Sequence, residues 1–376
     1  MIHKASHRLL PRFFQHSAFF SSNVHHRSTS YASALRQSFR PCAQPALPPT
    51  VTNTSQCCRH QSSSSPSEDP STSKHSKADI SSQKNSDTYT IKHGAANEIN
   101  IQDRVKIIPL GQGIIHVLLS RPDKLNSLDM PMFIAIADAA SRLKNDGSLS
   151  KDLRVVIISG EGKAFCTGLD AKSVALSGPS SSLKRLLERP SPYGGEDGLG
   201  NLAQDVCYLW RGLPVPVITC LHGMCFGGGL QVALGADMRF STPDCRLSIM
   251  ESRWGLIPDM GASITLRELV RIDVAKELTM TGRIVSGLEA EKIGLVTRCV
   301  DDPFKEAMKV AKEIIERSPD SVAATKELFQ STWVADEETC LNKETDLQMK
   351  LIATWNQIAA SGRQFGVNLP YFRRRD

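Results

Sequence analysis

Two acidic residues in the second half of the chain are spaced so that their side chains can share one pocket. Glu251 directly follows a predicted strand at 246–250, and Asp259 lies eight residues further on, across a loop that contains Pro258. Two carboxyl groups beside a C–H bond next to a carbonyl can remove a proton from one carbon and return one to another. Each residue also has a structural alternative, because Glu251 can cap a helix or pair with a base and Asp259 precedes a predicted helix.

Glycine-rich loops that follow two apolar segments offer backbone N–H groups as a second reactive feature. Gly168 lies in the loop GKAFCTGLD (162–170), and Gly227 to Gly229 lead into an apolar stretch. Glycine lets backbone approach a ligand closely, and the start of a helix favours negative charge. If the two apolar segments are neighbouring strands, two N–H groups can converge on one oxygen, such as a thioester carbonyl that becomes an enolate. The alternative is a tight turn packed under a core helix.

The elements that must position these residues alternate between strand and helix. Short β-branched runs predict strands, and apolar residues at helical spacing predict helices. Strands are expected at 105–110, 114–120, 153–159, 215–221 and 246–250, and helices at 130–144, 202–212, 262–270, 273–280, 288–293, 303–317, 319–331 and 335–361. This order predicts an α/β core with a C-terminal helical part, whose broad apolar faces favour an oligomer.

The N-terminal segment differs in composition from the rest of the chain. The formal net charge is +6, and seven Lys or Arg residues precede the first acidic residue, Glu68, so the remainder is close to neutral. Residues 1–61 are rich in Arg, Ser and His, which predicts an organelle transit peptide, mitochondrial as first choice and plastid as second. A disordered basic tail is the alternative. Residues 62–97 are low-complexity sequence and predict a linker.

Three classes of protein fit the composition poorly. An uninterrupted apolar run of about 18 residues is absent from the sequence, so we expect no membrane span. The ten cysteines include no pair with metal-ligand spacing, so we expect reduced thiols and no metal site. Apart from Arg373–Arg375 the body has no basic stripe, which argues against a nucleic-acid partner.

Five motifs together resemble the crotonase, or enoyl-CoA hydratase/isomerase, superfamily. They are RPDKLNSL (121–128), GKAFCTGLD (162–170), HGMCFGGGLQVALGAD (222–237), MESRWGLIPDMG (250–261) and TMTGRIVSGLEAEKIGLV (279–296). The resemblance covers residues 100–375. It implies a crotonase-like spiral of β-β-α units at 98–300, followed by a C-terminal helical domain at 301–376 that forms homotrimers or homohexamers. It also implies an acyl-CoA thioester as substrate, without metal or redox cofactor.

The resemblance assigns roles to individual residues. Leu169 and Gly228 align with the backbone donors of the oxyanion hole, and Glu251 with the second catalytic glutamate of the hydratases. The position of the first catalytic glutamate holds Gln231, an amide that cannot accept a proton at neutral pH. Asp259 aligns with an aspartate of the dienoyl-CoA isomerase branch, although that branch has a further aspartate at position 231. The residues expected to contact the substrate are Lys124, Ala164, Thr167, Gly168, Leu169, Asp170, Gly227, Gly228, Trp254 and Pro258.

We therefore expect an enzyme of fatty-acid β-oxidation that moves a double bond in an enoyl- or dienoyl-CoA, with Glu251 and Asp259 as proton-transfer partners. Enoyl-CoA hydration and a weakly active acyl-CoA-binding relative are the alternatives. Gln231 departs from the pattern of the hydratases and suggests the weakly active relative. It can also be a helix residue without a catalytic role. We expect Asp170 to fix its loop and Cys166 to be a packed thiol rather than a reactive one.

Overall fold

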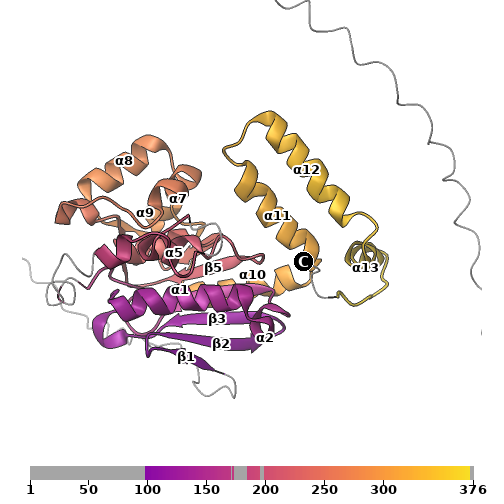
Figure 1. Ribbon diagram of the computed structural model, residues 1–376, viewed down its shortest axis with the longest axis horizontal. Coiled ribbons are helices and arrows are strands. Elements are labelled where there is room, and N and C mark those ends of the chain that lie inside the picture. The colour runs from indigo at the N-terminus through magenta and orange to yellow at the C-terminus, as the bar shows by residue number, and fades with distance from the viewer. Residues whose placement is uncertain (1–97, 171, 173–183, 195–198, 373–376) are drawn as a thin grey trace, which may run out of the picture. The chain divides into compact units, whose positions relative to one another are not determined.

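Strands with uninterrupted runs of buried residues form the centre of a seven-stranded sheet (Figure 1). The computed structural model describes residues 98–170, 172, 184–194 and 199–372, so the predicted transit peptide and linker lie outside the described residues. In order across the sheet the strands are β1 (Ile99–Ile101), β2 (Val105–Gly111), β3 (Ile114–Leu119), β4 (Val155–Gly160), β5 (Val217–Leu221), β7 (Met238–Ser241) and β10 (Arg298–Cys299). β1 to β3 are antiparallel, and the pairs from β3 onward are parallel.

A second, three-stranded sheet contains β6 (Met224–Phe226), β8 (Arg246–Ser248) and β9 (Val285–Ser286). The chain alternates between the sheets, because β5 and β7 join the large sheet while the strands that follow them, β6 and β8, join the small one. Successive passes of the chain therefore add a strand to each sheet, which confirms the predicted spiral. Five strands of two to four residues are too short to show a period and were not predicted: β1, β6, β7, β9 and β10.

Helices cover both faces of the large sheet, as the fully buried β3, β4 and β5 require. On one face lie α1 (Met130–Asn145), α5 (Leu202–Tyr208), α6 (Gly228–Leu234) and α7 (Ala262–Leu269), which contribute to the larger apolar core. The predicted helix at 202–212 ends early, since the chain continues past Tyr208 as turns. Further short helices of the core are η1 (Pro122–Lys124), α2 (Gly147–Ser150), η2 (Glu251–Trp254), α8 (Ile272–Thr281) and α9 (Gly287–Lys292).

The opposite face of the sheet is covered by α10 (Pro303–Ile315). Its Ala307 and Ala311 are fully buried against apolar residues of β3, β4, β5 and β7. Small residues at this spacing let the helix lie close to the sheet. α10, which falls within the predicted C-terminal helical domain (301–376), thus packs directly on the large sheet.

The C-terminal helices are α11 (Pro319–Thr332), α12 (Glu337–Leu351) and α13 (Trp355–Gln364). α11 and α12 run side by side as a hairpin (Figure 1). The helix predicted at 335–361 is two helices, because Ala353 adopts a φ of +61° and Thr354 then caps α13 by accepting from the Gln357 N–H. Lys326 attaches α11 to the core through an ion pair with Asp237 (2.8 Å).

Candidate active site

The two glycine loops leave adjacent parallel strands at the same edge of the large sheet. β4 pairs with β5, so the segments that follow them start side by side. The backbone pairing continues beyond the strands, because Cys166 and Cys225 form an isolated parallel β-bridge. The Phe226 N–H donates to the Cys166 carbonyl over 3.0 Å. The neighbouring strands that the sequence analysis required are thus present.

Only glycine fits at position 168. Gly168 has a φ of +81°, in the left-handed region. A Cβ there would lie 2.7 Å from the Phe226 carbonyl oxygen and 3.3 Å from the Gly228 nitrogen. Both contacts are to backbone, which no change of rotamer can relieve. A side chain at 168 would therefore push the two loops apart.

The N–H groups of Leu169 and Gly228 are unpaired within the part of the chain that the structure describes. Gly228 is the first residue of α6, where a helix offers its N–H no carbonyl. Leu169 lies between two bonds to Leu128, which donates to the Gly168 carbonyl (2.8 Å) and accepts from the Asp170 N–H (3.0 Å). Two free donors on adjacent backbone can stabilise an oxygen that gains negative charge.

The Glu251 carboxyl group lies against this glycine turn. Glu251 is the first residue of η2, three residues after the end of β8. A Cβ on Gly227 would lie 3.4 Å from the Glu251 Oε1 atom, and one on Gly228 would lie 2.8 Å from the Met260 sulfur. The carboxyl group and the Met260 side chain therefore lie against the turn that carries the free Gly228 N–H.

Gln231 joins Glu251 to the segment that follows Asp259. Gln231 lies on α6, three residues after Gly228, and is fully buried. Its Nε2 donates to the Glu251 Oε1 atom over 2.6 Å, and its Oε1 accepts from the Met260 N–H over 2.9 Å. Since a backbone N–H only donates, the amide oxygen must face Met260 and the amide nitrogen must face Glu251.

The environment raises the pKa of both carboxyl groups. Burial raises the pKa of Glu251 above its ordinary 4.5 and the charge of Asp259 adds to this, while hydrogen bonds from backbone and from Gln231 oppose it. Partial desolvation likewise raises the pKa of the Asp259 carboxyl above 3.8, although the residue as a whole is exposed. Elevated carboxyl pKa values bring proton exchange closer to neutral pH.

Asp259 does not cap the following helix, contrary to the structural alternative. The N-cap of α7 is Gly261, with a φ of +92° and no side-chain cap. Asp259 instead ends the exposed loop 255–259, in which Ile257 is 76% exposed and which follows Trp254, 68% exposed at the end of η2. A carboxyl group on such a loop, beside Glu251, is free to meet a ligand.

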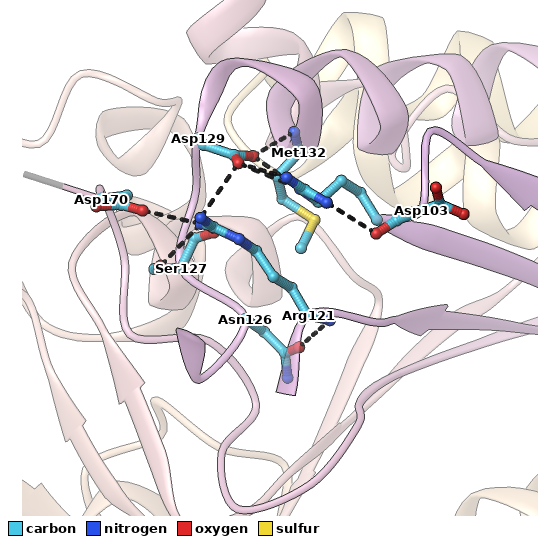
Figure 2. Close-up of polar contacts among 8 residues, drawn as sticks. Asp103, Arg121, Asn126, Ser127, Asp129, Met132 and Asp170 are labelled. Carbon is cyan, nitrogen blue, oxygen red and sulfur yellow. Dashed lines mark hydrogen bonds and ion pairs between the residues drawn. The ribbon is translucent and has the colours of Figure 1, made fainter. Parts of the chain in front are cut away.

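Ion pairs tie the loop after Leu169 to the motif at 121–128 (Figure 2). Arg121 donates to Asp170 over 3.0 Å and to the Ser127 carbonyl over 3.0 Å, and lies 3.3 Å from Asp129. Asp129 also pairs with Arg104 and caps α1 by accepting from the Met132 N–H. Asp170 thus fixes its loop, as expected. Roles for Arg121 and Asp129 were missed, although the basic residue that opens RPDKLNSL was a signal.

The other expected ligand contacts vary in exposure. Lys124 is exposed at the end of η1, and Pro258 is half-buried in the exposed loop. Thr167 is half-buried, with its hydroxyl 3.4 Å from the Leu125 carbonyl. Ala164 is fully buried, and its carbonyl accepts from the Asn126 side chain over 2.9 Å.

Within the described residues, no group of three or more His, Cys, Asp or Glu side chains is placed to hold a metal ion. Among those same residues no helix is both long and apolar enough to span a membrane. Burial raises the pKa of Cys166 to about 12, so at neutral pH it is a thiol rather than a nucleophilic thiolate.

Comparison with known proteins agrees with this geometry. The sequence profile of the family "Enoyl-CoA hydratase/isomerase" matches residues 110–364. The peroxisomal Delta(3,5)-Delta(2,4)-dienoyl-CoA isomerase of Arabidopsis thaliana is 30% identical over 256 residues, which cover 65% of this chain and 84% of that protein. Carnitinyl-CoA dehydratase of Salmonella typhi is 31% identical over 222 residues, covering 58% and 77% of the two chains.

Solved structures support the same grouping. The enoyl-CoA hydratase of Thermoplasma volcanium is 27% identical, with a TM-score of 0.60, over 69% of this chain and 97% of that one. The enoyl-CoA hydratase of Bacillus anthracis, at 23% identity and a TM-score of 0.62, covers 71% and 98% and shows the shared fold. With the profile matching most of the chain and the spiral of strands present, this chain belongs to the enoyl-CoA hydratase/isomerase family, whose members act on acyl-CoA.

Proposed function

We propose that this enzyme moves a carbon–carbon double bond in an enoyl- or dienoyl-CoA of fatty-acid β-oxidation. The observation that supports this most is the make-up of the site. Two carboxyl groups with raised pKa, Glu251 and Asp259, accompany two free N–H donors, while the third polar residue, Gln231, is an amide bound to protein at both ends.

The reaction starts with the thioester carbonyl accepting hydrogen bonds from the Leu169 and Gly228 N–H groups. Ionised Glu251 takes a proton from the carbon next to the carbonyl, and the C–H electron pair moves onto the thioester oxygen as an enolate. Protonated Asp259 then gives a proton to the far end of the conjugated system, and the double bond shifts toward the thioester. One proton passes from Glu251 back to Asp259, directly or through water, before the next turnover.

Gln231 disfavours hydration. Adding water across a double bond needs groups that hold the water and accept its proton, and an amide cannot accept a proton at neutral pH. The amide oxygen of Gln231 is engaged by Met260 and its nitrogen by Glu251. The 30% identity to a dienoyl-CoA isomerase points the same way.

Reversible hydration is the second candidate, because carnitinyl-CoA dehydratases are 31% identical to this chain. The test is a panel of 2-enoyl-, 3-enoyl- and 3,5-dienoyl-CoA thioesters with product analysis, using wild type and Asp259→Asn. Isomerised products that diminish in the variant support the proposal. Rapid formation of 3-hydroxyacyl-CoA from the 2-enoyl substrate, with no isomerised product from the others, would replace it with hydration.

We further propose that the mature enzyme is a mitochondrial homotrimer or homohexamer without metal or redox cofactor. The acid-free, Arg-rich residues 1–61 support import. A groove of about 590 Å³ between α11 and the core is bordered by Phe329 and Trp333, whose side chains are 53% and 59% exposed. Large exposed aromatic residues at a groove favour a protein partner, here another copy of the chain.

A further inference from the structure

The two oxygens of the Glu251 carboxyl group have different surroundings. Oε1 accepts the 2.6 Å bond from Gln231 and faces the Gly227 backbone. Oε2 is buried and has no hydrogen-bond partner among the described residues. A buried polar atom without a partner is costly and is concentrated at functional sites. The carboxyl group is therefore hydrogen-bonded at one oxygen and unpaired at the other, within the residues that the structure describes.

The amide that makes this difference is itself fixed. Gln231 is fully buried on α6, and the Met260 N–H determines which end of its amide faces Glu251. Met260 directly follows Asp259, so the same amide joins the backbone next to one carboxyl group with an oxygen of the other. Asp259 is the charged neighbour that acts on Glu251.

We propose that Gln231 is a positioning residue that commits Glu251 to proton transfer through Oε2 and holds the Asp259 segment beside it. The proposal rests on the isomerisation proposed above. In the forward step the substrate C–H bond breaks, an O–H bond forms at Oε2, and the electron pair moves to the thioester oxygen. The Gln231 N–H stays on nitrogen throughout and stabilises the carboxylate form at Oε1.

Two substitutions separate this role from simple packing. Gln231→Met keeps the length and volume but removes the donor to Oε1, so Glu251 loses stabilisation of its ionised form. Gln231→Glu keeps the pattern only when protonated, since its carbonyl can accept from Met260 and its O–H can donate to Glu251. When that proton leaves, two adjacent carboxylates repel each other.

The primary measurement is the protonation midpoint of Glu251, read by infrared difference spectroscopy against Glu251→Gln across a pH series. This readout needs no turnover. In Gln231→Met the midpoint should rise by about one pH unit, the value of a lost hydrogen bond to a charged group. Gln204→Met is the matched control, because it removes a half-buried amide from the capping box of α5 and should leave the midpoint unchanged.

Kinetics supply the second measurement. Gln231→Met should lower kcat of isomerisation about 10-fold or more with little change in KM. Gln231→Glu should regain activity at low pH and lose it as pH rises, which a purely structural role does not produce. A midpoint that rises in a protein without isomerase activity would support the positioning role and refute the proposed reaction. An unchanged midpoint and pH profile in both variants would overturn the positioning role, even in an active isomerase.

Discussion

Glu251 combines a buried carboxyl group with a single supporting hydrogen bond from a side chain. Its raised pKa means that the folded chain holds the proton more tightly than the unfolded chain does. The contribution of this group to stability is therefore fully present at pH below the unfolded value, and is lost as pH rises through the folded pKa. Ionised Glu251 thus lowers the free energy of unfolding, which is the trade-off between stability and activity that catalytic residues show.

Replacing this carboxyl group should separate stability from activity. Glu251→Gln retains an oxygen for the Gln231 amide and removes the buried charge. We expect the turnover number to fall about 10³-fold, the size of a general-base contribution, while the melting temperature at pH 7 stays equal or rises. Steady-state kinetics and thermal unfolding on one preparation measure both. A melting temperature lowered by several degrees would show that Glu251 is structural.

The pH dependence of kcat/KM should report the two carboxyl groups. The rate should rise with pH as Glu251 ionises, above its ordinary pKa of 4.5, and should fall again as Asp259, whose pKa is also raised, loses the proton that it must donate. Asp259→Asn removes the group whose ionisation causes the fall, so its residual activity should keep the rising limb and lack the falling limb. A falling limb that persists in the variant would mean that Asp259 is not the proton donor.

At the scale of elements, the site depends on two loops whose backbone is held by neighbouring parallel strands. The sequence could predict the two strands and the loops that follow them, because long β-branched runs at 153–159 and 215–221 indicate buried strands and glycine marks where each loop turns. It left open whether the two strands are neighbours, which the structure shows. It could not predict that Gln231 faces both Glu251 and Met260. Those contacts depend on a side-chain rotamer on α6 and on the path of the 255–259 loop, neither of which leaves a periodic signal.

The glycine in the first loop offers a direct test of backbone geometry. Gly168→Ala should reduce kcat about 100-fold or more, the effect of losing an oxyanion donor, because the added methyl group meets the backbone of the second loop. Gly366→Ala is the matched control, since Gly366 has the same φ of +81° and nothing within 4 Å of an added Cβ. Equal losses of activity in the two variants would contradict the oxyanion assignment.

The ion-pair network of Figure 2 should matter for the same loop. Arg121→Met removes the cation that pairs with both Asp129 and Asp170, two mostly buried carboxylates, which should cost about 3 kcal/mol of stability and lower kcat by shifting Leu169. Arg142→Met removes a more exposed pair with Asp138 and should change stability by less than about 0.5 kcal/mol. Chemical denaturation of both variants measures the difference in the free energy of unfolding. Equal losses of stability in the two variants would show that Arg121 does not position this loop.

At the scale of the whole molecule, the spiral core follows the predicted order of strands and helices, and the first of the C-terminal helices, α10, packs on its large sheet. α10 has the amphipathic pattern of any surface helix, and only its packing on the large sheet shows that it belongs to the core. Sequence periodicity gives the buried side of a helix but not the surface that covers it. The same ambiguity applies to α11, whose exposed aromatic residues favour contact with another copy.

Assembly can be tested at that exposed surface. Trp333→Asp should convert the oligomer to monomers, because a charge replaces a large apolar side chain at the groove beside α11. Asn342→Asp adds the same charge to an exposed position of α12 and should leave the mass unchanged. Light scattering coupled to gel filtration gives the masses. A wild-type protein that is already monomeric would refute the proposed assembly.

The central claim is that this site exchanges protons between carbons rather than adding water. The most direct measurement is the ratio of kcat/KM for isomerisation of a 3-enoyl- or 3,5-dienoyl-CoA to kcat/KM for hydration of a 2-enoyl-CoA of equal chain length, on one preparation of wild-type enzyme. We predict a ratio of about 100 or more, from the 10²- to 10⁴-fold contribution of a proton-transfer group that hydration lacks here. A ratio below one, with hydration at rates typical of efficient enzymes, would contradict the account.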